Sequence, residues 1–593
     1  MFLYRLLYPE PPPMEIVETM EEVRKRTPVP LAFELVRQSE IFLEESLYPQ
    51  AFSLLLDVLA SGNIASETGT VASTPVVIPQ PQHLAIAATM LVHPYTTTRA
   101  KLDAEKEAPN IALRLLRLTN ALVGPTAAQF HTAFAFTHFE TTRHGTRRGG
   151  SPALKEAMSE DKKKAWQTSF GGGRLVWNEA EDFWHAVGWA FNCSVLHPAL
   201  WKHWHLWLQF MCQVLEDDWT EREQQYAEAQ EKETLQNSDG EALNVEPPEQ
   251  ETHKGKGGRP RKVDEVKPKD GLEVFRESLL YQYVASNDIY GRDRRIMRAI
   301  FADGKPNSAE FRAVFEDEIK VHKPKKKRSS LKKRAGVDLN KGEYGDYEND
   351  SEDEYTNPKD SRASPSAPPA QNRLLRRPKR TRRTRNAIDR ATDSELDAYY
   401  KTADHENGIA SLGGYNSLVL RQRLLVLLSR LSIKLPKDFM STEDACHMFK
   451  ENIRDLPLPV FQHMVTPSKI QGLELGAHSY LCEHLSYSMH ESSAPPSNDD
   501  FLTQLKLERC FLPYMAASPS AANNAKISIL LEAMMTLLHY GKMLSATPEL
   551  KEAVRNGIER RQSACCGDSN AAALAYLRES SLRIKFMVDF VLP

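Results

Sequence analysis

The sequence predicts an all-α protein: two helical domains, each a bundle or an α-solenoid, separated by long disordered charged linkers. Three observations support this fold class. Apolar residues recur at three- and four-residue spacing in many segments, as on the buried face of a helix. No segment shows the alternating pattern of a strand, and no hairpin turn joins two such segments. Two long stretches carry too few apolar residues to form a core.

The N-terminal helical domain is expected over residues 1–219. In "NIALRLLRLTNALV", Ile111, Leu115, Leu118 and Leu122 form one apolar row. "PQHLAIAATMLVHP" is a second helical segment that stops at Pro94, and residues 95–109 are interpreted as a polar connection. The β-branched piece "STPVVIPQPQ" is enclosed by prolines, which predicts an extended loop rather than a strand.

Tryptophan is confined to one part of this domain, because all eight residues lie between Trp166 and Trp219. Asn178 followed by Glu181 has the form of a capping box, so a helix is expected to begin there. A second helix is expected from Pro198 to about Glu216, apolar around most of its circumference. Large aromatic side chains on such helices predict the centre of the core; a partner-binding or stacking surface is the alternative.

The rest of the chain alternates between polar and helical segments. Residues 220–270 are expected to be a disordered linker, although the first part is able to prolong the preceding helix. Residues 271–318 form a helical island expected to dock on the N-terminal domain, residues 319–395 a second disordered segment, and residues 396–593 a C-terminal helical domain. In that domain Ser441 with Asp444 marks a helix start. The segments do not recur at a fixed length, so no named repeat family is predicted.

"KGKGGRPRK" is the motif with the most specific chemistry, and it resembles the AT-hook of high-mobility-group A chromatin proteins. The resemblance implies that Arg259 and Arg261 lie in a narrow A·T-rich minor groove, with Pro260 keeping the backbone extended. Gly257 stands where the family usually has arginine, and a single copy implies modest affinity. The predicted DNA-binding residues are Lys254, Lys256, Gly257, Gly258, Arg259, Pro260, Arg261 and Lys262. A solvated basic linker is the alternative.

Two further basic blocks flank an acidic one and predict a nuclear protein. "PKKKR" in the first block resembles a monopartite nuclear localisation signal, so import receptors are expected partners. Seven carboxylates between Glu343 and Glu354 separate the blocks, and Ser351 and Ser364 are candidate phosphorylation sites. The predicted localisation residues are Lys323, Lys325, Lys326, Lys327, Arg328, Lys332, Lys333, Arg334, Arg376, Arg377, Lys379, Arg380, Arg382 and Arg383.

Composition narrows the class of protein further. The 76 Lys and Arg nearly balance the 79 Asp and Glu, so the charge is segregated along the chain rather than in excess. No run of 18 apolar residues exists, and the apolar N-terminus is too short for a signal peptide, so no membrane partner is expected. Seven cysteines without a spaced framework are typical of a reducing compartment, the cytosol or the nucleus.

Motifs for catalysis or metal binding are incomplete. Arg143-His144-Gly145 resembles the phosphate-binding triplet of histidine phosphatases, but no buried strand precedes it. The glycines in "FGGGR" lack the partners of a nucleotide-binding loop. His203 and His205 are two residues apart on a helix and therefore point away from each other, which excludes a shared zinc ion. No enzyme, cofactor or metal is predicted.

These observations predict a nuclear, chromatin-associated scaffold whose helical domains bind other nuclear proteins while the basic segments contact A·T-rich DNA. It would belong to a complex in chromosome maintenance, repair or transcription. Two alternatives stay open: a nucleolar RNA-binding ribosome-assembly factor, and an enzyme whose site is assembled from scattered residues of the helical domains. In a third, the basic tracts serve import alone.

Overall fold

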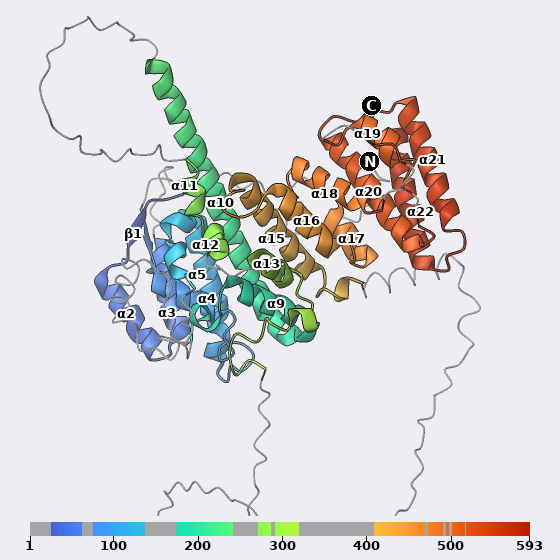
Figure 1. Cartoon of the computed structure of the whole chain (residues 1–593). Coiled ribbons are helices and arrows are strands. Elements are labelled where there is room, and N and C mark those ends of the chain that lie inside the picture. Colours follow the sequence, from blue (N-terminus) through green and yellow to red (C-terminus); the bar gives the residue numbers. More distant parts are fainter. Residues whose placement is uncertain are drawn as a thin grey trace, which may run out of the picture. The chain divides into compact units, whose positions relative to one another are not determined.

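A computed structural model describes residues 25–61, 75–136, 174–240, 271–285, 291–319, 408–468, 472–489, 494–496, 501–515 and 518–592. Within these ranges the protein is almost entirely helical (Figure 1), which confirms the predicted all-α class. We refer to residues 25–319 as the N-terminal half and residues 408–592 as the C-terminal half, counting the described residues of each range.

The first helices of the N-terminal half are α2 (Phe33–Glu44), α3 (Tyr48–Ser61), α4 (Pro81–Met90) and α5 (Asp103–Ala127). The prediction of a loop at "STPVVIPQPQ" was wrong: β2 (Val76–Ile78) pairs in parallel with β1 (Pro28–Pro30). Proline is tolerated here because each three-residue strand is an edge and needs few backbone donors; Val76 N donates to Thr27 O at 3.0 Å.

Helix α5 also begins earlier than predicted. Residues 103–109 were expected to belong to a polar connection, yet the helix starts at Asp103. The Glu105 carboxylate accepts hydrogen bonds from the backbone N–H of Leu102 at 3.1 Å and of Lys101 at 2.6 Å, which stabilises this polar first turn. The predicted row from Ile111 to Leu122 packs on the core. Near its end the helix is kinked at Gly124, whose φ is +79°.

The tryptophan-rich segment forms α8 (Val176–Glu179), α9 (Phe183–Leu196) and α10 (Pro198–Gly240), preceded by the short α6 (Phe130–Ala133). The expected helix start at Asn178 was wrong. Asp182 caps α9 instead, since its carboxylate accepts from His185 N at 2.6 Å, while Ala180 has extended backbone that ends α8.

Helix α10 extends well past the predicted end at Glu216, and its last turns reach beyond the neighbouring helices (Figure 1). The core interpretation of the tryptophans is confirmed: Trp204, Trp207 and Trp219 of α10 are fully buried, as are Trp177 and Trp184. The next elements are α11 (Glu273–Arg276), α12 (Leu279–Ala285), α13 (Arg292–Ile300) and a short 3₁₀ turn, η4 (Pro306–Ser308). Their buried apolar residues include Leu279, Tyr283 and Ile296.

The C-terminal half consists of α15 (Tyr415–Lys434), α16 (Thr442–Ile453), α17 (Leu458–Val465), α18 (Leu475–Tyr487), α19 (Gln504–Lys506), η5 (Leu507–Phe511), α20 (Ala521–Tyr540), α21 (Pro548–Ala564), α22 (Ala571–Phe586) and η6 (Met587–Val591). Both η5 and η6 are π-helical turns. The predicted start of α16 is confirmed, because Ser441 Oγ accepts from Asp444 N at 3.1 Å.

The two halves share one hydrophobic core. Buried side chains of α3, α5, α9, α10, α15, α18 and α20 belong to a single contiguous cluster, and a smaller cluster lies between α20 and α22. The described residues on both sides of the interval 320–407 therefore form one compact unit rather than two bodies joined only by a linker.

Candidate functional site: the α10 joint and the roots of the charged tracts

An acidic segment in the middle of α10, residues 216–221, joins elements from distant parts of the sequence. Glu216 accepts two hydrogen bonds of 2.7 Å from Arg423 of α15, so the two halves are connected by a bidentate ion pair. Burial alone would lower the pKa of Arg423, but the hydrogen bonds that it donates to Glu216 and the nearby carboxylates raise that pKa above its ordinary value. Arg423 therefore stays charged at any physiological pH.

The next two carboxylates bind different helices. Asp217 accepts from the Asn120 side chain of α5, and Asp218 accepts from the backbone N–H of Leu279 at the start of α12, at 2.8 Å. Burial raises the pKa of both carboxyl groups. Arg222 of the following turn lies 3.5 Å from Asp218 and 3.1 Å from Glu277. We call these contacts, together with Glu216–Arg423, the α10 joint.

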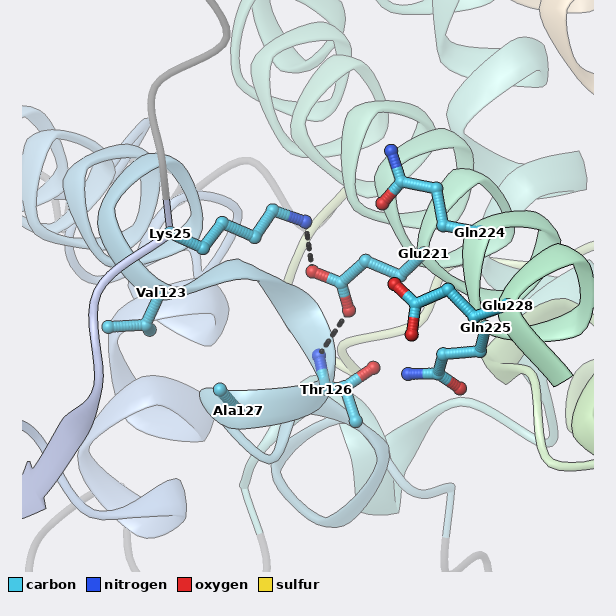
Figure 2. Close-up of a pocket in the computed structure, with 8 residues that line it drawn as sticks. All are labelled: Lys25, Val123, Thr126, Ala127, Glu221, Gln224, Gln225 and Glu228. Atoms are coloured by element: carbon cyan, nitrogen blue, oxygen red, sulfur yellow. Dashed lines mark hydrogen bonds and ion pairs between the residues drawn. The ribbon is translucent and has the colours of Figure 1, made fainter. Parts of the chain in front are cut away.

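Glu221 completes the joint and lines a cavity of about 340 Å³ (Figure 2). Its carboxylate contacts Lys25 and accepts from Thr126 N at 3.2 Å. Gly124 and Pro125 break and restart α5, which exposes the N–H of Thr126, and Glu221 caps that new first turn. A Cβ at Gly124 would stand 1.9 Å from Glu221 Oε1, so the close approach requires glycine.

Arg421 forms a second contact between the halves, and it uses no carboxylate. The side chain is fully buried and donates to the carbonyls of Ile300, Ala302 at 2.8 Å and Leu412 at 3.3 Å. Ile300 and Ala302 lie at the C-terminal end of α13, where carbonyl groups lack helical partners and favour a cation. The guanidinium also lies 4.0 Å from the centre of the Phe191 ring. Burial lowers the pKa of Arg421 to about 9.

An aromatic cluster lies where α10 passes Tyr226 and where the chain returns after the interval 241–270. Phe275 of α11 packs at 5.3 Å from the Tyr226 ring and 5.1 Å from the Trp219 ring of α10. Lys434, at the end of α15, places its ammonium group 5.7 Å from both the Tyr226 and the Phe275 ring. The chain therefore leaves along α10 past Tyr226 and returns beside it. We call this cluster the first root.

The interval 320–407 also begins and ends beside one helix. Two residues before it, Glu318 is buried and accepts from the indole N–H groups of Trp189 at 3.0 Å and Trp204 at 2.6 Å. After it, Gly413 lies against Ser194, five residues beyond Trp189 on α9. Its φ of +84° and the 2.0 Å that would separate an added Cβ from Ser194 Oγ both require glycine. We call these contacts the second root.

The pKa of Glu318 is raised to about 7. Burial causes the shift, and the hydrogen bonds from the two indoles and from the backbone N–H of Phe315 and Val314 oppose it. Within the described chain the carboxylate has no cationic partner and is stabilised by neutral N–H donors. These hydrogen bonds hold the residues before Lys320 against α9 and α10.

The predicted DNA-binding residues 254–262 lie in the first interval, and the localisation residues with Ser351 and Ser364 lie in the second; all are outside the described residues. Arg143, His144 and Gly145 are outside them as well. The residues of the α10 joint, Arg421 and Glu318 were not singled out from the sequence. The acidic run 216–218 directly after an apolar helix is the one feature of the sequence that points to the α10 joint. Arg421 and Glu318 have the sequence context of ordinary surface charges.

A serine hydroxyl and a histidine ring lie close together inside the described chain. Ser39 Oγ lies 2.8 Å from His83 Nε2, but it donates to Val36 O at 2.8 Å, and neither residue is exposed to solvent. Burial lowers the pKa of His83 to about 3, so the ring is neutral. His203 and His205 are half-buried on α10. Among the described side chains no group of three His, Cys, Asp or Glu is placed to hold a metal ion.

A search of the described helices for one long and apolar enough to cross a lipid bilayer found none. Comparisons of the chain with the profiles of known protein families, with curated proteins and with solved structures found no match.

Proposed function

We propose that this protein is a nuclear helical scaffold that contacts A·T-rich DNA through residues 254–262 and binds other chromatin proteins through its helical body. The observation that carries the proposal is the position of the two roots. Each charged interval starts and ends on one helical body, the first at the end of α10 and beside Tyr226, the second beside α9. A DNA contact made in an interval is therefore attached at two points to a body held together by the α10 joint.

The length of the first interval suits this task. Helix α10 continues for fourteen residues beyond Tyr226, or about 21 Å at 1.5 Å per residue. Lys262 is nine residues from Gly271, so the motif can lie up to roughly 30 Å from the first root when that chain is extended. This reach allows Arg259 and Arg261 to enter a minor groove about 6 Å wide and 7.5 Å deep while Gly271 stays beside Tyr226.

The residue types supply the preference for A·T pairs. Arginine is attracted to the enhanced negative potential of a narrow minor groove, and the guanine amino group obstructs the same position in G·C pairs. Lys254, Lys256 and Lys262 would add contacts to phosphate that carry no sequence information. The expected behaviour is therefore salt-sensitive binding with a preference for A·T-rich duplexes.

The test is fluorescence anisotropy of labelled A·T-rich and G·C-rich duplexes with the full chain across a salt series. Arg259→Ala/Arg261→Ala should abolish the A·T preference and lower the slope of log K against log salt by up to about 2, since each lost phosphate-type contact changes it by roughly 0.9. Lys267→Ala/Lys269→Ala removes the same charge from the same interval and should keep the A·T preference.

Two outcomes would redirect the proposal. Equal loss of affinity in both variants, with no base preference, would mean that the interval is only a solvated basic segment. Tighter binding to a structured RNA hairpin than to either duplex would favour the ribosome-assembly alternative.

Nuclear import is the second part of the proposal, carried by the basic blocks at 323–334 and 373–385. We expect a fluorescent fusion of the full chain to accumulate in the nucleus. Changing Lys325, Lys326, Lys327 and Arg328 to alanine should reduce that accumulation, and changing the second block as well should abolish it. Unchanged nuclear accumulation after both changes would contradict the assignment.

A further inference from the structure

The last helix of the described chain presents an apolar stripe to solvent. Leu582 of α22 is 63% exposed and Phe590 of η6 is 77% exposed, while Phe586 between them is half-buried and Val591 is partly exposed. The opposite face is packed, since Ile584 and Val588 are buried in the core. We define Leu582, Phe586 and Phe590, which are spaced four residues apart and share one helix face, as the α22 stripe. Three apolar side chains in a row on one face form a continuous strip rather than scattered surface exposure.

The π-helical turn η6 keeps this stripe straight. In an α-helix each step of four residues turns the row by about 40°, so a row at 582, 586 and 590 would drift around the helix. The wider turn of η6 reduces this drift. The Phe586 and Phe590 rings consequently stack, with centroids 5.3 Å apart and planes at 29°. The stripe is therefore a flat, pre-arranged aromatic surface.

The charges that flank the stripe are self-complementary. Lys585 and Asp589 are both exposed on the same side of the stripe. When two copies of this helix lie antiparallel, with the two-fold axis near Met587, Lys585 of each copy lies opposite Asp589 of the other. The same axis brings the two phenylalanine pairs together. Each copy therefore presents to the other the same apolar and charged residues that it contacts, as a two-fold symmetric interface requires.

We propose that the α22 stripe is the interface between two copies of this chain, packed antiparallel, with two Lys585–Asp589 ion pairs across the two-fold axis. The charge pattern favours a second copy, because the exposed Lys585 and Asp589 beside the stripe each meet an opposite charge in an antiparallel copy. The contact is small compared with the roughly 800 Å² per partner of a standard interface, so the dissociation constant is expected to be on the order of 10 µM.

The first measurement is sedimentation velocity of the full chain between 1 and 100 µM. The expected result is a concentration-dependent shift from monomer to dimer. Phe590→Ser should move the midpoint to at least tenfold higher concentration, and its melting temperature at low concentration should equal that of the unchanged protein, because Phe590 is exposed in the monomer. Phe33→Ser, which removes a similarly exposed phenylalanine on α2, is the matched control and should leave the dimer intact.

Charge reversal tests the antiparallel arrangement itself. Lys585→Glu places two like-charged pairs across the axis, and so does Asp589→Lys; each variant alone should dimerise several-fold more weakly. Mixing the two variants restores opposite charges at both positions, so a heterodimer of near-original affinity is expected.

A chain that remains monomeric at 100 µM would overturn the proposal. So would a dimer that is unaffected by Phe590→Ser, or two charge variants that do not recover on mixing, since each result would place the interface elsewhere. These outcomes do not depend on DNA binding, so they are distinguishable from a failure of the proposed function.

Discussion

Replacing Glu318 by glutamine should remove one pH-dependent contribution to the stability of this protein. The carboxyl group has a pKa of about 7 in the folded chain and an ordinary value near 4.5 when unfolded, because it is buried with only neutral donors. A group whose folded pKa is raised stabilises the fold below its unfolded pKa, and this contribution is lost as the pH rises through the folded value. Ionisation therefore costs roughly 3 kcal/mol above pH 8, and about 1 kcal/mol of that change falls between pH 6 and pH 8.

The assay is urea unfolding followed by tryptophan fluorescence, which reports directly on the half of the chain that contains every tryptophan. Buried histidines complicate a single pH profile, because burial lowers the pKa of His83 and His93 to about 3 and of His478 to about 4. Their contribution is present above about pH 6.5 and is lost as the pH falls, opposite in sign to that of Glu318. The comparison is therefore made between the unchanged protein and Glu318→Gln at each pH, where the histidine contributions cancel.

The free energy of unfolding of the unchanged protein minus that of Glu318→Gln should be about 1 kcal/mol more positive at pH 6 than at pH 8. Glu316→Gln, which removes an exposed carboxylate two residues away, serves as the control for charge removal. A difference between Glu318→Gln and the unchanged protein that is constant from pH 6 to pH 8 would refute the reasoning, because it would mean that Glu318 ionises at an ordinary pH in the folded chain.

Three further predictions concern the joint between the halves. Cleavage at a protease site placed within the interval 320–407 should leave two fragments that elute together in size-exclusion chromatography. The reason is that the shared core and the α10 joint hold the halves together without the covalent connection. Separation of the fragments in native buffer would contradict this prediction. Arg421→Leu should lower the free energy of unfolding in urea by about 2–4 kcal/mol, because the carbonyls of Ile300 and Ala302 lose their donor. The control is Arg430→Leu, which changes a half-buried residue of the same helix and should lower the free energy of unfolding by less than about 1 kcal/mol. Gly124→Ala should lower the free energy of unfolding by about 1–3 kcal/mol, because the residue has a φ of +79° and the added Cβ would clash with Glu221. The control is Gly476→Ala in α18, where nothing lies within 4 Å of the added Cβ, and it should raise the melting temperature slightly. Equal effects of the two changes would show that the kink at Gly124 is not constrained.

Periodicity and single caps were sufficient to predict much of the helical body. The leucines of α15 at 420, 424, 427 and 431 are all buried, and Ser441 caps α16 as its spacing with Asp444 indicated. These signals are local: an apolar row must be buried against something, and a hydroxyl three residues before an exposed N–H bonds to it wherever the rest of the chain lies.

Two of the errors arise where a distant contact bears on a local choice. Asp182, rather than Asn178, caps α9, and the same carboxylate is also held by Arg295 from α13. Val76–Ile78 becomes a strand only because residues 28–30 supply a partner. The predicted DNA-binding and localisation residues lie outside the described chain, so they remain predictions from the sequence.

The arrangement of the two roots has a mechanical consequence. When a receptor bound at the second interval is pulled, the tension enters and leaves the helical body at neighbouring points, Glu318 and Gly413. When a duplex bound at the first interval is pulled, the tension enters along the last turns of α10 and leaves at Gly271, beside Tyr226. The load therefore acts to open the root itself, and little of it is transmitted across Glu216–Arg423 or the cage around Arg421. A chain with the same segments joined end to end would instead place the full force on the seam between its domains.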